Sequence, residues 1–339
     1  MVRFGIIGCG VIAPYHARAI EKASDAALVA VCDIIKDKAA AFSQKFGNPR
    51  IYQNYKKLLS DSDVDAVCIC TPSGMHGKMC IDAAKAGKHI LCEKPMEITK
   101  AKLDKVIAEV EKTGVKMACV FQRRMQANPM RVKAALERGE FGKVLFADAY
   151  LKYYRSPEYY KSADWRATWE LDGGGALMNQ GVHGIDLISW FMGGVDSVFG
   201  IARTQTHDIE VEDVAVAAVK YKNGAIGVIE GSTCAYPAQD TRFEIHCEKG
   251  TIVFSDAGII QWARMGEPEE KLAQEKSECA PGNDPTAIGA LSHLPIIRDL
   301  TDSIERDRPP AVTPREGRKA VDTILAIYKS SQTGKEVKL

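Results

Sequence analysis

The first 120 residues alternate short apolar runs with helix-like stretches, and this alternation constrains the fold more than any other feature. Short strands that are apolar throughout are typical of a parallel sheet buried on both faces. Strands that alternate with helices predict βαβ units, so we expect a doubly wound parallel sheet over residues 1–121. The expected strands are Val2–Ile7, Ala27–Cys32, Asp65–Cys70, His89–Cys92 and Val115–Phe121.

After about Gln122 the pattern changes, because strand-like segments now follow one another and helices are few. Turn signals at Asn223-Gly224 and Lys249-Gly250 separate some of these strands. At roughly 150 residues per domain, the 339 residues suggest two domains. We therefore predict that residues 122–339 form an α+β domain with a large, open, mostly antiparallel sheet. One α-helix is expected over Gly175–Phe191, and a polar surface loop over Gly266–Asp284.

Composition excludes several classes of function. The formal net charge of +1 gives no broad field for nucleic acid or an acidic membrane. No apolar run approaches the roughly 18 residues of a membrane span, and the N-terminus lacks a signal-peptide pattern, so we expect a cytoplasmic protein. None of the ten cysteines forms a CxxC pair. We interpret them as buried apolar residues in a reducing compartment and expect no metal site.

A glycine-rich turn follows the first strand. Gly8-Cys9-Gly10-Val11-Ile12-Ala13 has the form GxGxxA and opens a helix, the context of a dinucleotide-binding turn. Gly8 permits the tight turn, and Gly10 lets the backbone approach a pyrophosphate, which the helix N-terminus would stabilise. Asp33, 20 residues after Ala13, can accept hydrogen bonds from the ribose hydroxyls of NAD. Because a carboxylate repels the 2′-phosphate of NADP, we predict NAD as the cofactor.

Two more segments come directly after strands of the predicted parallel sheet, namely Thr71-Pro72-Ser73 and Glu93-Lys94-Pro95. In open parallel sheets, ligands bind beyond the carboxyl ends of the strands. Both segments should therefore face the cofactor, and Lys94 is a candidate functional residue.

At this point the chain resembles a known family, the Gfo/Idh/MocA oxidoreductases. The opening Gly5–Ala13 with His16 is similar to the start of that family, and Thr71–His76 to its second cofactor loop. Glu93-Lys94-Pro95 resembles the EKP motif of the family, and Gly173–Asp186 its glycine-rich motif with a catalytic histidine. The resemblance covers nearly the whole chain.

The resemblance implies a Rossmann domain followed by an α/β domain with an open sheet, and oligomers formed by packing such sheets together. It implies that Lys94 and His183 are catalytic and face the substrate beside the nicotinamide. The cofactor contacts that we expect are Gly8, Gly10, Val11, Ile12, Asp33, Thr71, Pro72, His76, Glu93 and Lys94.

One departure concerns Asn179, because many relatives have aspartate there. Asn179 and His183 are four residues apart and would share one face of a helix. The asparagine fits a branch that resembles nucleotide-sugar or glycoside 3-dehydrogenases better than inositol dehydrogenases.

Oxidation of an alcohol needs a base for the hydroxyl proton and a hydride acceptor above the carbon. We favour His183 as the base and Lys94 as its electrostatic partner, while the reverse assignment stays open. Asn179, Arg124, Tyr154 and Arg166 are candidate substrate contacts, since aromatic faces pack against sugars and arginines bind anionic groups. The aromatic residues of 153–169 could equally belong to the core or to a subunit interface.

These observations predict an NAD-dependent dehydrogenase that acts on a hydroxyl carbon of a sugar, glycoside or nucleotide sugar, with C3 as one candidate. An alternative is an NAD-dependent glycosidase that oxidises its sugar transiently. A non-catalytic, sugar-sensing regulator is disfavoured because both Lys94 and His183 are present. We expect a homodimer or homotetramer.

Overall fold

The computed structural model describes residues 1–268, 270, 289 and 291–339, and most of the predicted loop Gly266–Asp284 lies outside them. The chain divides into two compact units. The first comprises Met1–Gln122 and Gly289–Arg318, and the second Arg123–Ile288 and Lys319–Leu339. Our sequence division had assigned all of 122–339 to the second domain. The segment 289–318 belongs to the first unit because its helix packs on α1 and Cys119 N donates a hydrogen bond to Val312 O.

The first unit contains a six-stranded, wholly parallel sheet in the order β3-β2-β1-β4-β5-β6. The chain starts in the middle, winds outward to β3, and returns to the other side of β1 at β4. This order confirms the predicted doubly wound fold, and ligands in such sheets bind where the winding reverses. Its strands are β1 (Val2–Ile7), β2 (Ala26–Cys32), β3 (Arg50–Tyr52), β4 (Ala66–Ile69), β5 (His89–Cys92) and β6 (Met117–Cys119).

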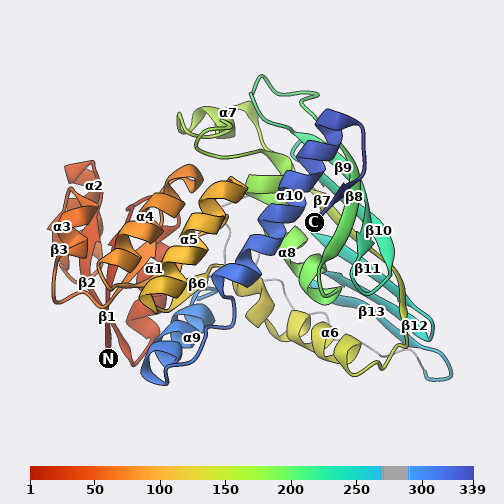
Figure 1. The fold of residues 1–339 in the computed structure, drawn as a ribbon, viewed down its shortest axis with the longest axis horizontal. Coiled ribbons are helices and arrows are strands. Elements are labelled where there is room, and N and C mark those ends of the chain that lie inside the picture. Colours follow the sequence, from red (N-terminus) through yellow and green to blue (C-terminus); the bar gives the residue numbers. More distant parts are fainter. Residues whose placement is uncertain (269, 271–288, 290) are drawn as a thin grey trace. The chain divides into compact units, whose positions relative to one another are not determined.

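Helices cover both faces of this sheet. Right-handed crossovers place α1 and α2 on one face and α3, α4 and α5 on the other. Figure 1 shows α4 and α5 side by side, and α9 packs against α1. The short elements β3 and α3 escaped prediction because three to five residues carry little periodicity. The helices are α1 (Ala13–Lys22), α2 (Lys36–Lys45), α3 (Tyr55–Leu59), α4 (Ser73–Lys85), α5 (Lys100–Thr113) and α9 (Leu294–Glu305).

The second unit contains an eight-stranded sheet in the order β13-β12-β11-β7-β10-β9-β8-β14. All neighbouring strands are antiparallel except β7 and β10, so the predicted mostly antiparallel sheet is confirmed. Its strands are β7 (Val144–Lys152), β8 (Val195–Arg203), β9 (Val214–Tyr221), β10 (Ile226–Ser232), β11 (Arg242–Cys247), β12 (Gly250–Ser255), β13 (Gly258–Arg264) and β14 (Val337–Lys338).

Helices cover one face of this larger sheet. Helix α8 (Val182–Phe191) packs on β7, and α6 (Ala127–Glu137) packs on α8. Helix α10 (Pro314–Thr333) lies against β8, where the Ser330 hydroxyl accepts a hydrogen bond from Gly200 N. The remaining helical elements of the unit are a 3₁₀ turn at Gln122–Met125, α7 (Pro157–Lys161) and a π-helical segment at Ala176–Gly181.

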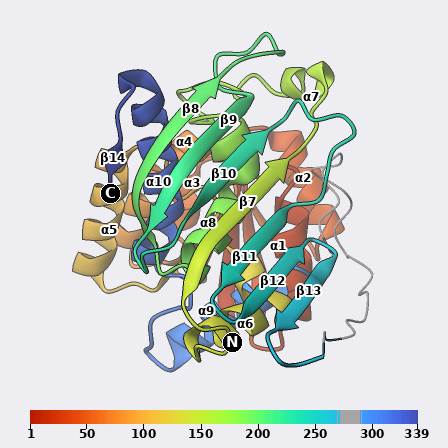
Figure 2. The same ribbon diagram turned by 90° about the vertical axis from the view of Figure 1, so that its right-hand side faces the viewer.

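The opposite face of the eight-stranded sheet is open. In Figure 2 this face is turned toward the viewer, and no helix of the described chain crosses it. Register places large apolar side chains from four strands together on it, each 42–59% exposed. These side chains are Phe146, Phe199, Ile201, Val216 and Ile226.

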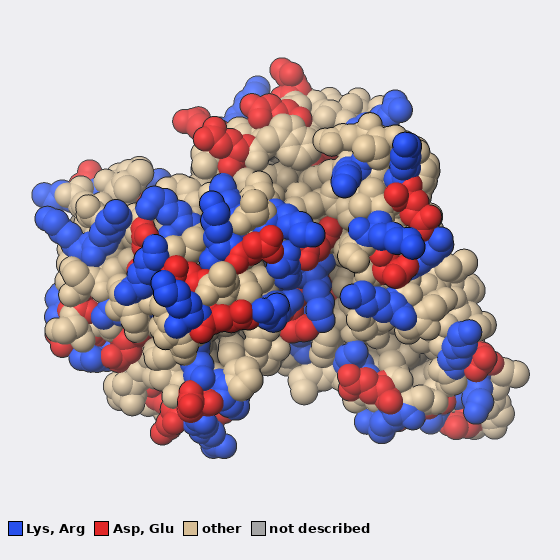
Figure 3. Space-filling model, in the orientation of Figure 1, with Lys and Arg blue, Asp and Glu red and all other residues tan. Residues whose placement is uncertain are grey.

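We find no helix among the described residues that combines the length and the hydropathy of a membrane span. On the face drawn in Figure 3, basic and acidic side chains are interspersed, in keeping with the near-zero net charge.

Candidate active site

The glycine turn lies at the carboxyl end of β1 and leads into α1. Gly8 has a φ of +94°, and a Cβ there would lie 2.6 Å from the carbonyl oxygen of Cys70, so only glycine fits. A Cβ at Gly10 would meet nothing of the described chain within 4 Å, so its backbone is open to a ligand. Ile12 is the N-cap of α1, and no side chain among the described residues caps this helix. Its first N–H groups therefore suit an anion such as a pyrophosphate.

Asp33 lies beside this turn at the end of β2. Its Oδ2 accepts a hydrogen bond from Cys9 N, and its Oδ1 accepts one from Ile35 N, both at 2.9 Å. These bonds fix the carboxylate and still leave lone pairs for further donors, because a carboxylate offers about four acceptor positions. Val11 and Ile34 flank this region and are 60% and 84% exposed. The residues present thus fit the pyrophosphate, ribose and base of a dinucleotide.

The loops after β4 and β5 are tied together by His76. Its ring is buried, with Nδ1 2.7 Å from the carbonyl oxygen of Pro95 and Nε2 2.7 Å from that of Thr71. Pro72 is the N-cap of α4, so Thr71 and Pro72 lie where the chain turns into that helix. Because both nitrogens of His76 contact backbone oxygens, the residue positions the two loops. A direct cofactor contact of His76 stays a prediction.

Glu93 anchors the loop that carries Lys94. His16 Nε2 donates to Oε1 of Glu93 at 2.7 Å, His293 Nε2 lies 3.4 Å from the same oxygen, and Lys94 N donates to Oε2 at 3.2 Å. Burial alone disfavours the charge, but the hydrogen bond from His16 and the nearby ring of His293 outweigh it and hold the pKa of Glu93 well below its ordinary value. Burial also lowers the pKa of His16, so the pair is a neutral imidazole and a carboxylate. From residue 90 to residue 98, Lys94 is the one side chain that is not buried.

The glycine-rich motif of the second unit begins in a tightly packed turn. Gly174 has a φ of +152°, and a Cβ at Gly175 would overlap the carbonyl oxygen of Glu212. The buried Glu212 carboxylate accepts hydrogen bonds from Gly175 N and Leu177 N, at 2.9 and 2.8 Å, and from the Tyr328 hydroxyl at 2.8 Å. The turn therefore requires glycine, and one carboxylate fixes its backbone.

The prediction of one α-helix over Gly175–Phe191 is wrong for its first turns. Residues 176–181 form a π-helix, and α8 begins only at Val182. Asn179 lies in the π-helix and His183 in α8, so the four residues between them are not continuous α-helix, and a shared face stays a prediction. Periodicity did not reveal the π turn because the segment is apolar on nearly all sides. From residue 172 to residue 189, only Asn179, Gln180 and His183 are partly exposed.

Two of the predicted substrate contacts lie in one polar network. Asn179 Nδ2 donates to Asp172 Oδ1 at 2.5 Å, and its Oδ1 accepts from Gln180 Nε2 at 2.7 Å. Gln180 Nε2 also donates to the Tyr159 hydroxyl, which accepts a second bond from Arg166 Nη1 at 2.8 Å. Asp172 and Gln180 are not among the site residues predicted from the sequence. Their position in or next to the glycine-rich motif could have marked them as candidates. Their hydrogen-bond partners, however, depend on tertiary packing that the sequence does not show.

The other two predicted substrate contacts have different surroundings. Tyr154 is partly exposed and packs edge-on against Tyr236, with ring centroids 5.1 Å apart. Arg124 is buried and forms a bidentate ion pair with Asp186, with N–O distances of 2.7 and 2.6 Å. A guanidinium held in this way stabilises the fold around α8. A substrate role for Arg124 stays a prediction.

Two groups in the described residues bring metal-ligating atoms within 4.8 Å of one another. They are His16, Glu93 and His293 in the first unit, and His207, Asp213 and Cys234 in the second. Their members are far apart in the sequence, so spacing could not reveal them. In the first group, Glu93 Oε1 lies 2.7 Å from His16 Nε2 and 3.4 Å from His293 Nε2. In the second, His207 Nδ1 lies 3.1 Å from Asp213 Oδ2 and 3.6 Å from Cys234 Sγ.

Comparisons with known proteins agree with this geometry. Residues 2–121 match the oxidoreductase family with an NAD-binding Rossmann fold, and residues 130–253 match the GFO/IDH/MocA C-terminal domain. The chain belongs to the Gfo/Idh/MocA family of NAD-binding oxidoreductases, as its motifs predicted.

Individual relatives match this chain over its full length or nearly so. The chain is 29% identical to the myo-inositol 2-dehydrogenase of Thermotoga maritima, over 100% of this chain and 98% of that protein. It is 27% identical to D-xylose 1-dehydrogenase (NADP(+)) 2 of Haloferax volcanii, over 99% of each. Its fold matches the crystal structure of the WlbA dehydrogenase from Bordetella pertussis in complex with NADH and UDP-GlcNAcA. The TM-score is 0.88 and the identity 31%, over 100% of this chain and 98% of that one.

Proposed function

We propose that this protein is an NAD-dependent dehydrogenase that oxidises or reduces a hydroxyl carbon of a sugar, glycoside or nucleotide sugar, with C3 as one candidate carbon. The observation that carries the proposal is a pattern of burial shared by both units. Each unit holds a buried motif that leaves only a few polar side chains partly exposed, namely Lys94 in one and Asn179, Gln180 and His183 in the other. Partly exposed polar groups on buried, rigid backbone are typical of catalytic residues.

In this reaction His183 accepts the proton of the substrate hydroxyl as the carbon loses a hydride. Lys94 stabilises the negative charge that develops on the oxygen, and the Glu93 anchor holds its loop in place. The roles of Lys94 and His183 can also be exchanged. When NAD is bound, it supplies the hydride acceptor, and the Gly8–Ala13 turn with Asp33 would hold it.

NAD is the proposed cofactor because Asp33 is fixed beside the glycine turn, where a 2′-phosphate would meet its charge. The WlbA relative was crystallised with NADH, which supports this choice. The relative from Haloferax volcanii is named for NADP, so titration of this protein with both cofactors is needed.

A nucleotide sugar is the first substrate class to examine, because the WlbA structure contains UDP-GlcNAcA. The test is a panel of UDP-sugars, glycosides, free sugars and inositols incubated with NAD and followed by NADH absorbance. Net NADH formation with one class supports the proposal. Release of an aglycone without net NADH would instead favour a glycosidase that oxidises its sugar transiently.

The open face of the eight-stranded sheet supports a homodimer or homotetramer. Five large apolar side chains are exposed together on it, and a second copy of the chain would remove them from water. Light scattering at micromolar concentration should give at least twice the 37.1 kDa of one chain. A monomer would contradict this part of the proposal.

A further inference from the structure

Four side chains of the second unit form a row of hydrogen bonds that all point in one direction. Arg155 donates to Gln180 Oε1 through Nε and Nη2, at 3.0 and 2.6 Å. Gln180 Nε2 donates to Asn179 Oδ1 at 2.7 Å, and Asn179 Nδ2 donates to Asp172 Oδ1 at 2.5 Å. The row links a guanidinium to a carboxylate through two amides. We call it the amide relay.

The two ends of the amide relay fix the orientation of both amides. A guanidinium has only donors, so Gln180 must turn its oxygen toward Arg155 and its nitrogen toward Asn179. An ionised carboxylate only accepts, so Asn179 must turn its nitrogen toward Asp172. Both ends therefore require the same arrangement, and reversing either amide would place like groups against each other.

Burial makes this arrangement costly to break. Arg155 is 6% exposed and Asp172 is 2% exposed, so neither charge can exchange its partner for bulk water. The second oxygen of Asp172 accepts from Ala167 N at 2.9 Å, so the carboxylate is held from two sides. The ends of the relay are buried, whereas its middle residues, Asn179 and Gln180, are partly exposed, as is His183.

We infer that Asp172 is a positioning residue for the active site, which fixes through Asn179 the polarity of the amide that the site presents to its substrate. This inference rests on the proposed function, because it assumes that the exposed side of the glycine-rich motif meets substrate. Asp172 does not itself touch the reacting atoms. Loss of its carboxylate should impair turnover by releasing Asn179.

The hydrogen-bond pattern gives a sharp test by exchange of two residues. Asn179→Asp alone places two carboxylates against each other, so one of them must take up a proton. Asp172→Asn alone needs one amide oxygen to accept from both Ala167 N and Asn179 Nδ2, which lie on different sides. In the exchanged double variant, the amide at 172 accepts from Ala167 N and donates to the carboxylate at 179. That carboxylate also accepts from Gln180, so every bond of the relay is restored.

We expect each single variant to lower kcat/KM by roughly ten- to a hundredfold, mainly through kcat. The double variant should recover to within about fivefold of the wild type, which a merely additive loss cannot do. Asp196→Asn is the matched control, since it makes the same chemical change on an exposed residue of β8. If Asp172→Asn does not fold, the comparison of Asn179→Asp with the double variant still measures the rescue.

Denaturant unfolding of the wild type, the two single variants and the double variant separates this inference from the proposed function. If the wild type turns over no substrate in the panel, the proposed function fails, and the relay is then judged by coupling between positions 172 and 179 in the free energy of unfolding. Absence of that coupling overturns the inference. If the wild type is active and Asp172→Asn leaves its kcat/KM unchanged, the inference is also overturned. The same holds if kcat/KM of the double variant is no higher than the two single losses multiplied together would give.

Discussion

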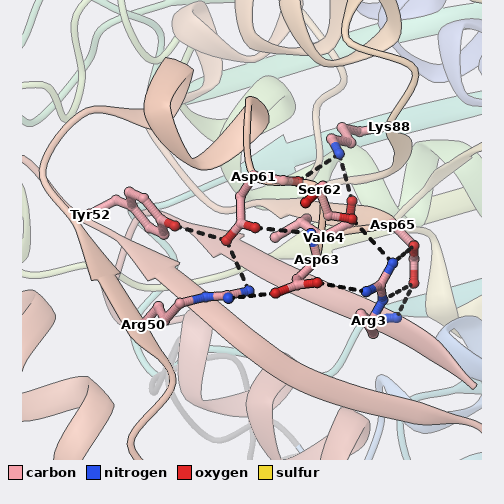
Figure 4. Close-up of polar contacts among 9 residues, drawn as sticks. All are labelled: Arg3, Arg50, Tyr52, Asp61, Ser62, Asp63, Val64, Asp65 and Lys88. Atoms are coloured by element: carbon pink, nitrogen blue, oxygen red, sulfur yellow. Dashed lines mark hydrogen bonds and ion pairs between the residues drawn. The ribbon is translucent and has the colours of Figure 1, made fainter.

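The two ends of the parallel sheet in the first unit use their polar residues in opposite ways. At the amino end, Arg3 of β1 forms ion pairs with Asp65 and Asp63, at 2.7 and 3.1 Å, and Arg50 of β3 pairs with Asp63 at 2.7 Å. Lys88, just before β5, donates to the carbonyl oxygens of Asp61 and Val64. Figure 4 shows these residues joined in one network of side-chain and main-chain contacts.

At the carboxyl end, the Asp33 carboxylate is held by backbone groups, and large apolar side chains beside it stay exposed. Asp33 accepts only backbone N–H groups in the described chain, and Val11 and Ile34 are open to solvent beside it. A network whose charges satisfy one another has little left to offer a ligand, whereas fixed acceptors next to exposed apolar surface do. The amino end should therefore contribute stability and the carboxyl end function, which substitutions can test.

The largest effect is expected at Lys94, just beyond the carboxyl end of β5. Lys94→Ala should abolish measurable turnover and leave NAD binding nearly intact, because the glycine turn holds the pyrophosphate. Lys88→Ala, at the amino end of the same strand, is the matched control and should lower the melting temperature while turnover persists. Steady-state kinetics, NAD titration and thermal unfolding of both variants decide the point. Loss of turnover in both variants would contradict the proposed difference between the two ends of the sheet.

His183 should give the next largest effect. His183→Asn removes the proposed base and should lower kcat by roughly two to four orders of magnitude, the usual contribution of a positioned base. The control is His89→Asn at the amino end of β5, where the ring accepts a hydrogen bond from Lys116 N. If kcat of the His183 variant stays within a few-fold of the wild type, Lys94 becomes the candidate base.

Asp33 should govern the choice of cofactor. The wild type should bind NAD roughly ten- to a hundredfold more tightly than NADP, and Asp33→Asn should remove most of that preference. Asp37→Asn, the same change at an exposed aspartate in the first turn of α2, serves as the control. Titration of each protein with both cofactors gives the ratio. Equal binding of the two cofactors by the wild type would contradict the role given to Asp33.

The smallest effect is expected at Asp65, in the amino-end network. The hydrogen bond from Arg3 lowers the pKa of Asp65, so its stabilisation is present above the ordinary carboxyl pKa and is lost as the pH falls through the lowered value. Asp65→Asn should lower the melting temperature by about 1–4 °C at neutral pH, since the pair is partly exposed. Calorimetry should show this difference shrinking below about pH 4. Reduced turnover at neutral pH would contradict a purely stabilising role.

Sequence alone predicted the two sheets, their classes and most strands, because apolar runs and turn signals report burial and chain reversal directly. It also predicted that Gly8, Asp33 and Lys94 lie at carboxyl ends of strands. A residue that follows a strand in the sequence lies at the carboxyl end of that strand, whatever the order of the strands in the sheet. The positions of β3, α3 and β13 needed tertiary contacts that no local pattern encodes.

The parts of the site that sequence did not reveal depend on partners distant in the chain. Arg124 follows the predicted strand Val115–Phe121 and was a candidate substrate contact, yet its guanidinium forms an ion pair with Asp186 of α8. Glu93 and His293 are 200 residues apart in the sequence, yet His293 Nε2 lies 3.4 Å from Glu93 Oε1. Asn179 lies in the π-helical turn Ala176–Gly181 and His183 in α8, a junction that the sequence pattern did not reveal.

Transfer of deuterium tests the central claim most directly. Sugars and nucleotide sugars labelled at the candidate hydroxyl carbons are incubated with the enzyme and NAD, and the reduced cofactor is analysed by mass spectrometry. We predict that one labelled position transfers deuterium to NAD, and that Lys94→Ala and His183→Asn suppress this transfer while cofactor binding persists. Cofactor binding without transfer from any labelled position would contradict the account and favour a sugar-sensing regulator.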